Sequence, residues 1–243
     1  MNNKTYYHLI LDQSGSMSSC VNETISGFNE QLQMIRDMQR AHTNQQILVS
    51  LTTFNHFVHH PVNCSNPDQV QPLNKQTYVP DGTTALYDAI GESVMSLKAQ
   101  AGHEFEKDQA SAVIIILTDG YENASRLFSI KNVRNLIREL EDTGKWTFSF
   151  LGADMAAINH AENLNIRREN AASYSKVDSD KAFNAMSNSI DMYMSEKSAG
   201  KISKDFLKRR TATRRISFEP LLNFFSSTSV QASSCTDFFT TFI

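Results

Sequence analysis

Apolar residues in the first 200 positions form two alternating patterns. One is a short, nearly continuous run, typical of a buried β-strand, and the other repeats every three to four residues, typical of an amphipathic α-helix. The runs predicted as strands cover 6–11, 46–54, 112–117, 146–151 and 171–175. The segments predicted as helices cover 21–39, 85–99, 129–140, 154–164 and 178–194. This alternation predicts an α/β domain with a parallel sheet and helices on both faces.

Two runs place particular strands within this sheet. The run 112–117 is almost entirely β-branched, which predicts burial on both faces and hence a central parallel strand. The segment 57–62 follows strand 46–54 after a turn at Asn55 and contains Pro61. Proline cannot donate a ladder hydrogen bond, so we expect this segment to form a hairpin strand at an edge of the sheet.

The segments between and within these elements carry further expectations. Asn22 or Ser18 is suited to cap the helix 21–39, the polar segment 63–80 is expected to be a surface connection, and 101–109 a charged linker. Helical spacing predicts which side chains of the helices 129–140 and 178–194 face the core. They are Ile130, Val133, Ile137, Leu140, Phe183, Met186, Ile190 and Tyr193.

The first strand ends at a group of oxygen-bearing side chains. Asp12 closes the apolar run, and Ser14 and Ser16 follow on alternate residues with Gly15 between them. Glycine allows the tight backbone that would let the three side chains converge. Carboxylate and hydroxyl oxygens are hard donors that suit Mg²⁺, Mn²⁺ or Ca²⁺. The carboxyl end of a parallel strand is also where open α/β sheets place their ligands.

The segment 12–17 resembles the D-x-S-x-S signature of von Willebrand factor type A (vWA) domains, the first loop of their metal-ion-dependent adhesion site. The stretches 81–90 and 116–120 resemble the second and third metal loops of that family. The resemblance covers about residues 4–198. Within the family, the chain is similar to the stand-alone vWA domains of intracellular bacterial proteins. The resemblance implies a Rossmann-like, doubly wound, mostly parallel sheet with one antiparallel edge strand.

The resemblance also implies a set of metal ligands. Ser14 and Ser16 would bind the ion directly, and Asp12 and Asp119 would act largely through water. A second-loop threonine completes the set. Counting back from Ile90 favours Thr84, which we prefer because a helix fixes the end of the loop, whereas counting forward from Gly82 favours Thr83.

Such a site implies binding rather than catalysis. Hydroxyl ligands are neutral, so an Asp or Glu of a protein partner can complete the coordination of the dication. The three loops contain no base–nucleophile pair, and we therefore expect no enzymatic activity. Asp81 stands where relatives often have glycine, and this extra carboxylate is either a hindrance to acidic partners or another ligand.

The composition of the chain argues against several other classes of function and location. The net charge of −3 over 243 residues gives no reason to expect nucleic acid as a partner. No apolar stretch approaches the roughly 20 residues that span a bilayer, and the first apolar run is too short for a signal peptide, so the expected location is cytoplasmic. The widely separated Cys20, Cys64 and Cys235 are expected to be reduced thiols. Nothing in the pattern predicts an oligomeric state.

Three alternatives stay open. Asp12 with Mg²⁺ also suits phosphoryl transfer, although phosphatases of the haloacid dehalogenase type need a second Asp where Ser14 stands. The segment 199–243 is basic and then rich in Ser and Thr; it is either a solvated, flexible tail or a nucleic-acid-binding one. A third alternative is a transition-metal site on the predicted hairpin, where a solvated surface is favoured because no Cys or carboxylate cluster accompanies the histidines. They are His56, His59 and His60.

Overall fold

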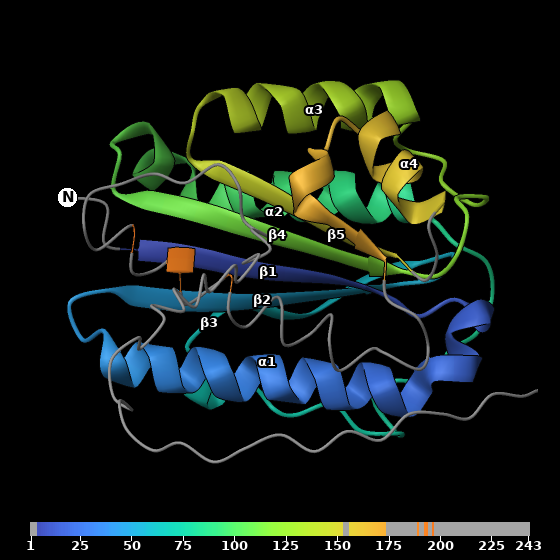
Figure 1. The fold of residues 1–243 in the computed structure, drawn as a ribbon, viewed down its shortest axis with the longest axis horizontal. Coiled ribbons are helices and arrows are strands. Elements are labelled where there is room, and N and C mark those ends of the chain that lie inside the picture. The colour runs from blue at the N-terminus through green and yellow to red at the C-terminus, as the bar shows by residue number, and fades with distance from the viewer. Residues whose placement is uncertain (1–3, 153–155, 174–188, 190–191, 194–195, 197–243) are drawn as a thin grey trace, which may run out of the picture. The chain divides into compact units, whose positions relative to one another are not determined.

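Six strands form a single sheet in the order β3–β2–β1–β4–β5–β6 (Figure 1). The computed structural model describes residues 4–152, 156–173, 189, 192, 193 and 196. The strands are β1 (Lys4–Asp12), β2 (Gln46–Phe54), β3 (Val58–Ser65), β4 (Ala110–Thr118), β5 (Trp146–Gly152) and β6 (Ala171–Ser173). All neighbouring strands pair in parallel except β2 and β3, which are antiparallel, so the predicted mostly parallel sheet with an antiparallel edge strand is confirmed.

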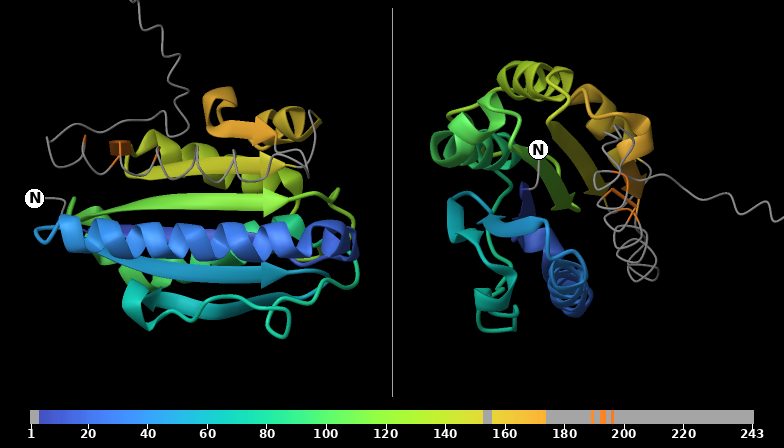
Figure 2. Two further views of the ribbon diagram at one scale, coloured as in Figure 1. Left: turned by 60° about the horizontal axis from the view of Figure 1, so that its bottom comes forward. Right: turned by 90° about the vertical axis from the view of Figure 1, so that its left-hand side faces the viewer.

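Helices cover both faces of the sheet (Figure 2). They are α1 (Val21–Ala41), α2 (Leu86–Glu106), α3 (Ile130–Asp142) and α4 (Ala156–Asn163), with short 3₁₀ helices at Gly15–Cys20, Pro67–Gln69 and Arg168–Asn170. One core cluster joins α1 to alternate side chains of β1, among them Leu9 and Leu11. The other core cluster joins α2 and α3 to the intervening residues, among them Tyr6 and Ile10. The predicted doubly wound architecture follows from this alternation.

The chain reverses its direction of travel across the sheet at β1. It proceeds from β1 to β2 and β3 on one side, and then crosses to β4, β5 and β6 on the other. The carboxyl ends of β1 and β4 therefore lie side by side at a topological switch point, the usual ligand position in open α/β sheets. Asp12 ends β1 and Thr118 ends β4 at this point.

The second helix is longer than the sequence pattern predicts. The expected charged linker at 101–109 is wrong, because α2 continues to Glu106. Ala101 and Phe105 extend the buried stripe of the helix, so the charges of this segment belong to its outer face. The Phe105 ring packs against the rings of Tyr6 and Trp146, at centroid distances of 5.6 and 4.6 Å.

Two expectations about helix starts are also wrong. Neither Asn22 nor Ser18 caps α1, because the 3₁₀ helix runs directly into it and Cys20 occupies the N-cap position without a side-chain hydrogen bond. The helix α3 begins with a capping box formed by Ser129 and Asn132. Ile130 is the first residue of α3 and is 41% exposed, whereas the next three predicted inward residues are buried. They are Val133, Ile137 and Leu140.

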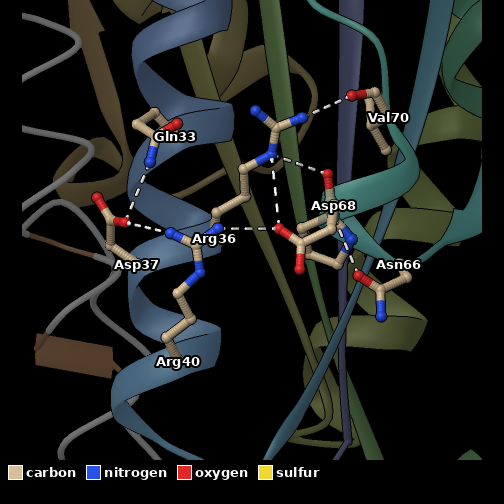
Figure 3. A network of polar contacts seen from close by, with 8 residues as sticks. Gln33, Arg36, Asp37, Arg40, Asn66, Asp68 and Val70 are labelled. Carbon is tan, nitrogen blue, oxygen red and sulfur yellow. Dashed lines mark hydrogen bonds and ion pairs between the residues drawn. The ribbon is translucent and has the colours of Figure 1, made fainter.

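The polar segment 63–80 is more firmly attached than a surface connection. Its first residues extend β3, and Val70, Leu73 and Tyr78 are buried against the α1 side of the sheet. Figure 3 shows how α1 binds its backbone: the guanidinium of Arg36 donates to the carbonyls of Pro67 and Val70, at 3.0 and 2.7 Å. Around these bonds, four further hydrogen bonds extend the network. They are Arg40 with Asp37 and Asp68, Gln33 with Asp37, and the Asp68 amide with Asn66.

The remaining expectations meet the described residues only in part. Neither Cys20 nor Cys64 forms a disulfide among the described residues, and no helix in that part of the chain is long and apolar enough to cross a membrane. Tyr193 is buried in the core as predicted, but most of the helix 178–194 lies outside the described residues. The predicted tail 199–243, with Cys235 and the basic stretch, also lies outside them.

A buried polar network connects the first three strands to α2. Thr52 Oγ1 lies 2.8 Å from His8 Nε2 and 2.9 Å from His60 Nδ1, and Ser93 Oγ donates to it at 2.8 Å. Burial, with a smaller contribution from the charge of His60, lowers the pKa of His8 to about 3. The His8 ring is therefore neutral near pH 7 and depends on Thr52 for its hydrogen bond.

We expect Thr52→Val to lower the free energy of unfolding by about 2 kcal/mol, because it leaves buried polar atoms without their shared partner. The matched control is Thr53→Val, which makes the same change on the opposite face of β2, where we expect a loss of about 0.5 kcal/mol or less. Urea denaturation followed by fluorescence measures both. Equal losses in the two variants would contradict a stabilising role for the network.

Candidate metal centre

Asp12 is fully buried and has hydrogen-bond partners on three of its atoms. Its Oδ1 accepts from the Ser14 amide at 2.7 Å, and its Oδ2 accepts from the Thr118 hydroxyl at 2.5 Å. Its carbonyl oxygen accepts from the Tyr78 hydroxyl at 2.5 Å. The carboxylate is thus held in one orientation at the junction of β1 and β4.

The environment of Asp12 opposes its ionisation. Burial raises the pKa of this carboxyl above its ordinary value, and the nearby charge of Asp119 adds to the rise. The hydrogen bonds from Thr118 and Ser14 act in the opposite direction, because they stabilise the charged form. A cation at this place would offset the desolvation of the carboxylate.

The first loop brings its two hydroxyls toward the third loop. Ser14 is buried, Ser16 is exposed, and their Oγ atoms lie 3.1 Å apart. Ser16 Oγ donates to Asp119 Oδ1 at 2.5 Å. Because Asp119 follows β4, this contact joins two loops that are far apart in the sequence.

The second loop is fastened to the first through its backbone. The Gly15 amide donates to the Gly82 carbonyl at 3.0 Å, and the Asp81 amide donates to the Gln13 carbonyl at 2.9 Å. Gly82 has a φ of +76°, and a Cβ there would lie 2.2 Å from the His56 ring, so only glycine fits. Asp81 is exposed, and its Oδ1 accepts from the Gly82 amide at 2.8 Å within the loop itself.

The two candidate threonines differ in their surroundings. Thr83 is exposed, whereas Thr84 is buried. The Thr84 amide donates to Asn123 Oδ1 at 2.9 Å, and its carbonyl accepts from the amides of Asn123 and Ala124. A Cβ placed on Gly120 would lie 2.8 Å from Thr84 Oγ1. Thr84, rather than Thr83, therefore faces the third loop.

The same Cβ position on Gly120, in the third loop, lies close to oxygens of the first and second loops. It lies 3.4 Å from Asp12 Oδ2 and 3.4 Å from Ser14 Oγ, besides its contact with Thr84. Since Ser14 contacts Ser16, which contacts Asp119, the five predicted ligands come together above the carboxyl ends of β1 and β4. Thr83 and Asp81 were the alternative ligands. Among the hydrogen bonds of the described residues, none joins the side chain of either residue to this group.

Further residues position these loops and were not predicted. Tyr78 and Thr118 hold Asp12, and Asn123 holds Thr84. Asp88, in the first turn of α2, accepts from the backbone amides of 126, 127 and 128. Glu122 accepts from the amides of 87, 124 and 125. Of these, Asp88 and Thr118 lie within the stretches that resemble the second and third metal loops, whereas Tyr78, Asn123 and Glu122 lie outside them.

The donor set fits a hard divalent cation. It offers three hydroxyls and two carboxylates, all oxygen, which suits Mg²⁺, Mn²⁺ or Ca²⁺ rather than a thiophilic ion. The described residues contain no group of three or more His, Cys, Asp or Glu side chains that could hold a metal ion. The histidines of the β2–β3 hairpin therefore do not form such a group. Any cation at the three loops would therefore depend on hydroxyl ligands.

The sequence was compared with protein-family models and with curated proteins. The family model of the von Willebrand factor type A domain matches residues 8–191. No curated protein matches the sequence.

Solved structures with a similar fold come from several organisms. The vWF domain of the type V pili tip protein Mfa5 from Porphyromonas gingivalis has a TM-score of 0.56 at 10% identity, covering 79% of this chain and 96% of that one. A manganese-loaded TRAP protein of Plasmodium vivax has a TM-score of 0.51 at 17% identity, covering 75% and 72%. Proximal thread matrix protein 1 from the mussel byssus has a TM-score of 0.51 at 13% identity, covering 76% of this chain, which spans 45% of that protein. At these identities the likeness shows the fold alone.

We expect Gly120→Ala to lower the free energy of unfolding by about 1–2 kcal/mol, because its Cβ would crowd the Thr84 hydroxyl and the loops would have to move apart. The matched control is Gly102→Ala in α2, where no atom lies within 4 Å of the added Cβ. There we expect a gain of up to about 1 kcal/mol from helix propensity. Chemical denaturation in EDTA measures both, and an unchanged stability of Gly120→Ala would contradict the close approach.

We expect Asp12→Asn to be at least as stable as the parent protein at pH 7 in EDTA. The pKa of Asp12 is raised on folding, so its contribution to stability is present below the unfolded pKa and is lost as the pH rises through the folded pKa. The advantage of the neutral variant should therefore shrink as the pH falls toward the ordinary carboxyl pKa of about 3.9. Melting temperatures between pH 4 and 8 test this, and a variant that is less stable at pH 7 would contradict it.

Proposed function

Because this chain belongs to the von Willebrand factor type A domain family, we propose that it is a metal-dependent protein-binding module. A divalent cation would be held by Asp12, Ser14, Ser16, Thr84 and Asp119. An Asp or Glu of a protein partner would complete its coordination. The observation that carries the proposal is the convergence of oxygens from three separate loops beside Gly120.

The charge balance of the site supports a role in binding an acidic group. Hydroxyl ligands add no charge, so the carboxylates of Asp12 and Asp119 are the anionic groups that would balance the dication within the ligand set. A cation bound in this way remains electrophilic and attracts a further carboxylate from outside. When bound, the ion would supply the attraction for the partner's acid, and the loops would supply its position.

Asp81 has a different part in this proposal. Its carboxylate accepts from the Gly82 amide and is exposed at the rim, so we place it outside the ligand set. Its negative charge raises the repulsion that an acidic partner meets before a cation is bound. The proposal therefore assigns Asp81 a share in making partner binding dependent on the metal.

The proposal is non-enzymatic. Members of this family commonly act as metal-dependent adhesion or interaction modules. Phosphoryl transfer needs a positioned nucleophile or base as well as the cation. Ser14, which stands where a phosphatase of the haloacid dehalogenase type needs its second Asp, is in this proposal a ligand. Mg²⁺ is the expected ion, with Mn²⁺ or Ca²⁺ as alternatives, and the cytoplasmic location stays a prediction.

We expect Mg²⁺ or Mn²⁺ to raise the melting temperature of the protein. A ligand present at about ten times its Kd stabilises the folded state by about 1.4 kcal/mol, which corresponds to a few degrees for a domain of this size. Thr84→Ala, and Ser14→Ala combined with Asp119→Ala, should abolish the increase. Thermal melts and calorimetric titration measure the effect.

Thr83→Ala is the matched control for Thr84→Ala, since it removes the same hydroxyl one residue earlier from an exposed position. It should keep the cation-induced stabilisation. If Thr83→Ala removes the stabilisation and Thr84→Ala keeps it, the ligand assignment is wrong. If the parent protein responds to none of Mg²⁺, Mn²⁺ or Ca²⁺, the proposed function is wrong.

A further inference from the structure

Large apolar side chains are exposed around the candidate metal centre. Among the described residues, six large hydrophobic side chains are strongly exposed. Three of them lie in the segments that form the centre or cover it: Phe57, Val79 and Tyr121, at 62%, 55% and 66% exposure. Of the other three, Met95 lies on α2, Ile130 is the first residue of α3, and Leu127 lies in the loop that precedes α3. We call Phe57, Val79 and Tyr121 the apolar rim.

The structure holds Phe57 at this rim through its backbone and its neighbour. Asn55 closes the turn after β2, because its amide donates to the Phe57 carbonyl and its side chain accepts from the Phe57 amide, at 3.0 and 2.9 Å. The Phe57 ring lies 4.4 Å from the His56 ring, measured between centroids. His56 in turn lies against Gly82 in the second loop. Phe57 is thus fixed beside the second loop rather than left on a free turn.

Val79 and Tyr121 flank the second and third loops. The Val79 carbonyl accepts from the Gln13 side chain at 2.8 Å, which ties the start of the second loop to the first. Tyr121 directly follows Gly120, whose Cβ position touches Thr84 Oγ1. The second and third loops are therefore each flanked by an apolar side chain that is exposed to solvent.

The apolar rim and the metal centre would bind different kinds of side chain of one partner. The centre offers a cation that a carboxylate would complete, whereas Phe57, Val79 and Tyr121 would gain by burying apolar surface. Without a cation, Asp12, Asp119 and Asp81 make this region negative, so apolar contacts alone would have to overcome that repulsion for an acidic partner. We propose that the partner segment carries its Asp or Glu next to a large aliphatic or aromatic side chain. This side chain packs on the apolar rim while the carboxylate reaches the cation, so the inference rests on the proposed function.

The experiment selects random peptides displayed on phage against the full chain in Mg²⁺ or Mn²⁺, with elution by EDTA. We expect the enriched peptides to carry an acidic residue within two positions of a large apolar one. Phe57→Gln and Tyr121→Gln should bind these peptides at least about tenfold more weakly, the loss expected when a large apolar side chain no longer buries its surface. Their cation-induced thermal stabilisation should equal that of the parent.

The matched control is Met95→Gln, which makes the same kind of change at an exposed position of α2 outside the loops. It should leave peptide binding unchanged. Enriched acidic peptides without an apolar neighbour, or equal binding by the rim variants, would overturn the apolar rim while leaving the proposed function intact. If no peptide elutes with EDTA and no cation stabilises the protein, the proposed function itself is overturned.

Discussion

A carboxylate buried at the junction of two parallel strands constrains the rest of this structure. Asp12 ends β1 where the chain switches from one side of the sheet to the other, and it has almost no contact with solvent. Burial makes its charge costly, as the raised pKa indicates. Thr118, Ser14 and Tyr78 all direct hydrogen bonds at this one residue. The surrounding loops can be understood as the means of keeping that charge oriented.

The loops are held together by the protein's own hydrogen bonds. Backbone bonds join the first loop to the second, and the side chain of Asn123 joins the second to the third. Asp88 and Glu122 then anchor the chain that runs from the third loop to α3 on the first turn of α2. These hydrogen bonds fix the three loops relative to one another, and loops that are already fixed lose less conformational freedom when a ligand binds.

The sequence predicts the elements whose signals are local. Continuous apolar runs located the strands, and Pro61 placed β3 at the edge, as the pairing confirms. The linker expected at 101–109 failed because its charges hid the buried positions of Ala101 and Phe105. The segment 63–80 is largely the exposed connection that was predicted, but its polar composition concealed a few buried residues. Local composition reports the average polarity of a segment, but burial depends on where each side chain points.

The candidate site shows the same division between local and distant information. The residues Asp12, Ser14 and Ser16 are recognisable because they lie within one loop, and the geometry around Gly120 separates Thr84 from Thr83 in a way that counting positions cannot. Tyr78 lies outside the recognisable loops and acts across a long sequence separation, so nothing near it in the chain marks its role. Asp88 lies within the second-loop stretch, but its hydrogen bond to the amide of 126 could not be predicted from that stretch.

The proposed function implies an order of binding at the site. The region of Asp12, Asp119 and Asp81 is negative before a cation is bound, which opposes an approaching carboxylate at close range. The exposed side chains of the apolar rim are uncharged and attract apolar surface in either state. In the proposed function, apolar contact alone would favour many partners weakly, and the negative centre would repel the acidic ones among them. A bound dication would offset most of that negative charge and would offer a coordination position to a carboxylate. Selectivity in such an arrangement comes from requiring both interactions in one segment, since each alone is either too general or repulsive.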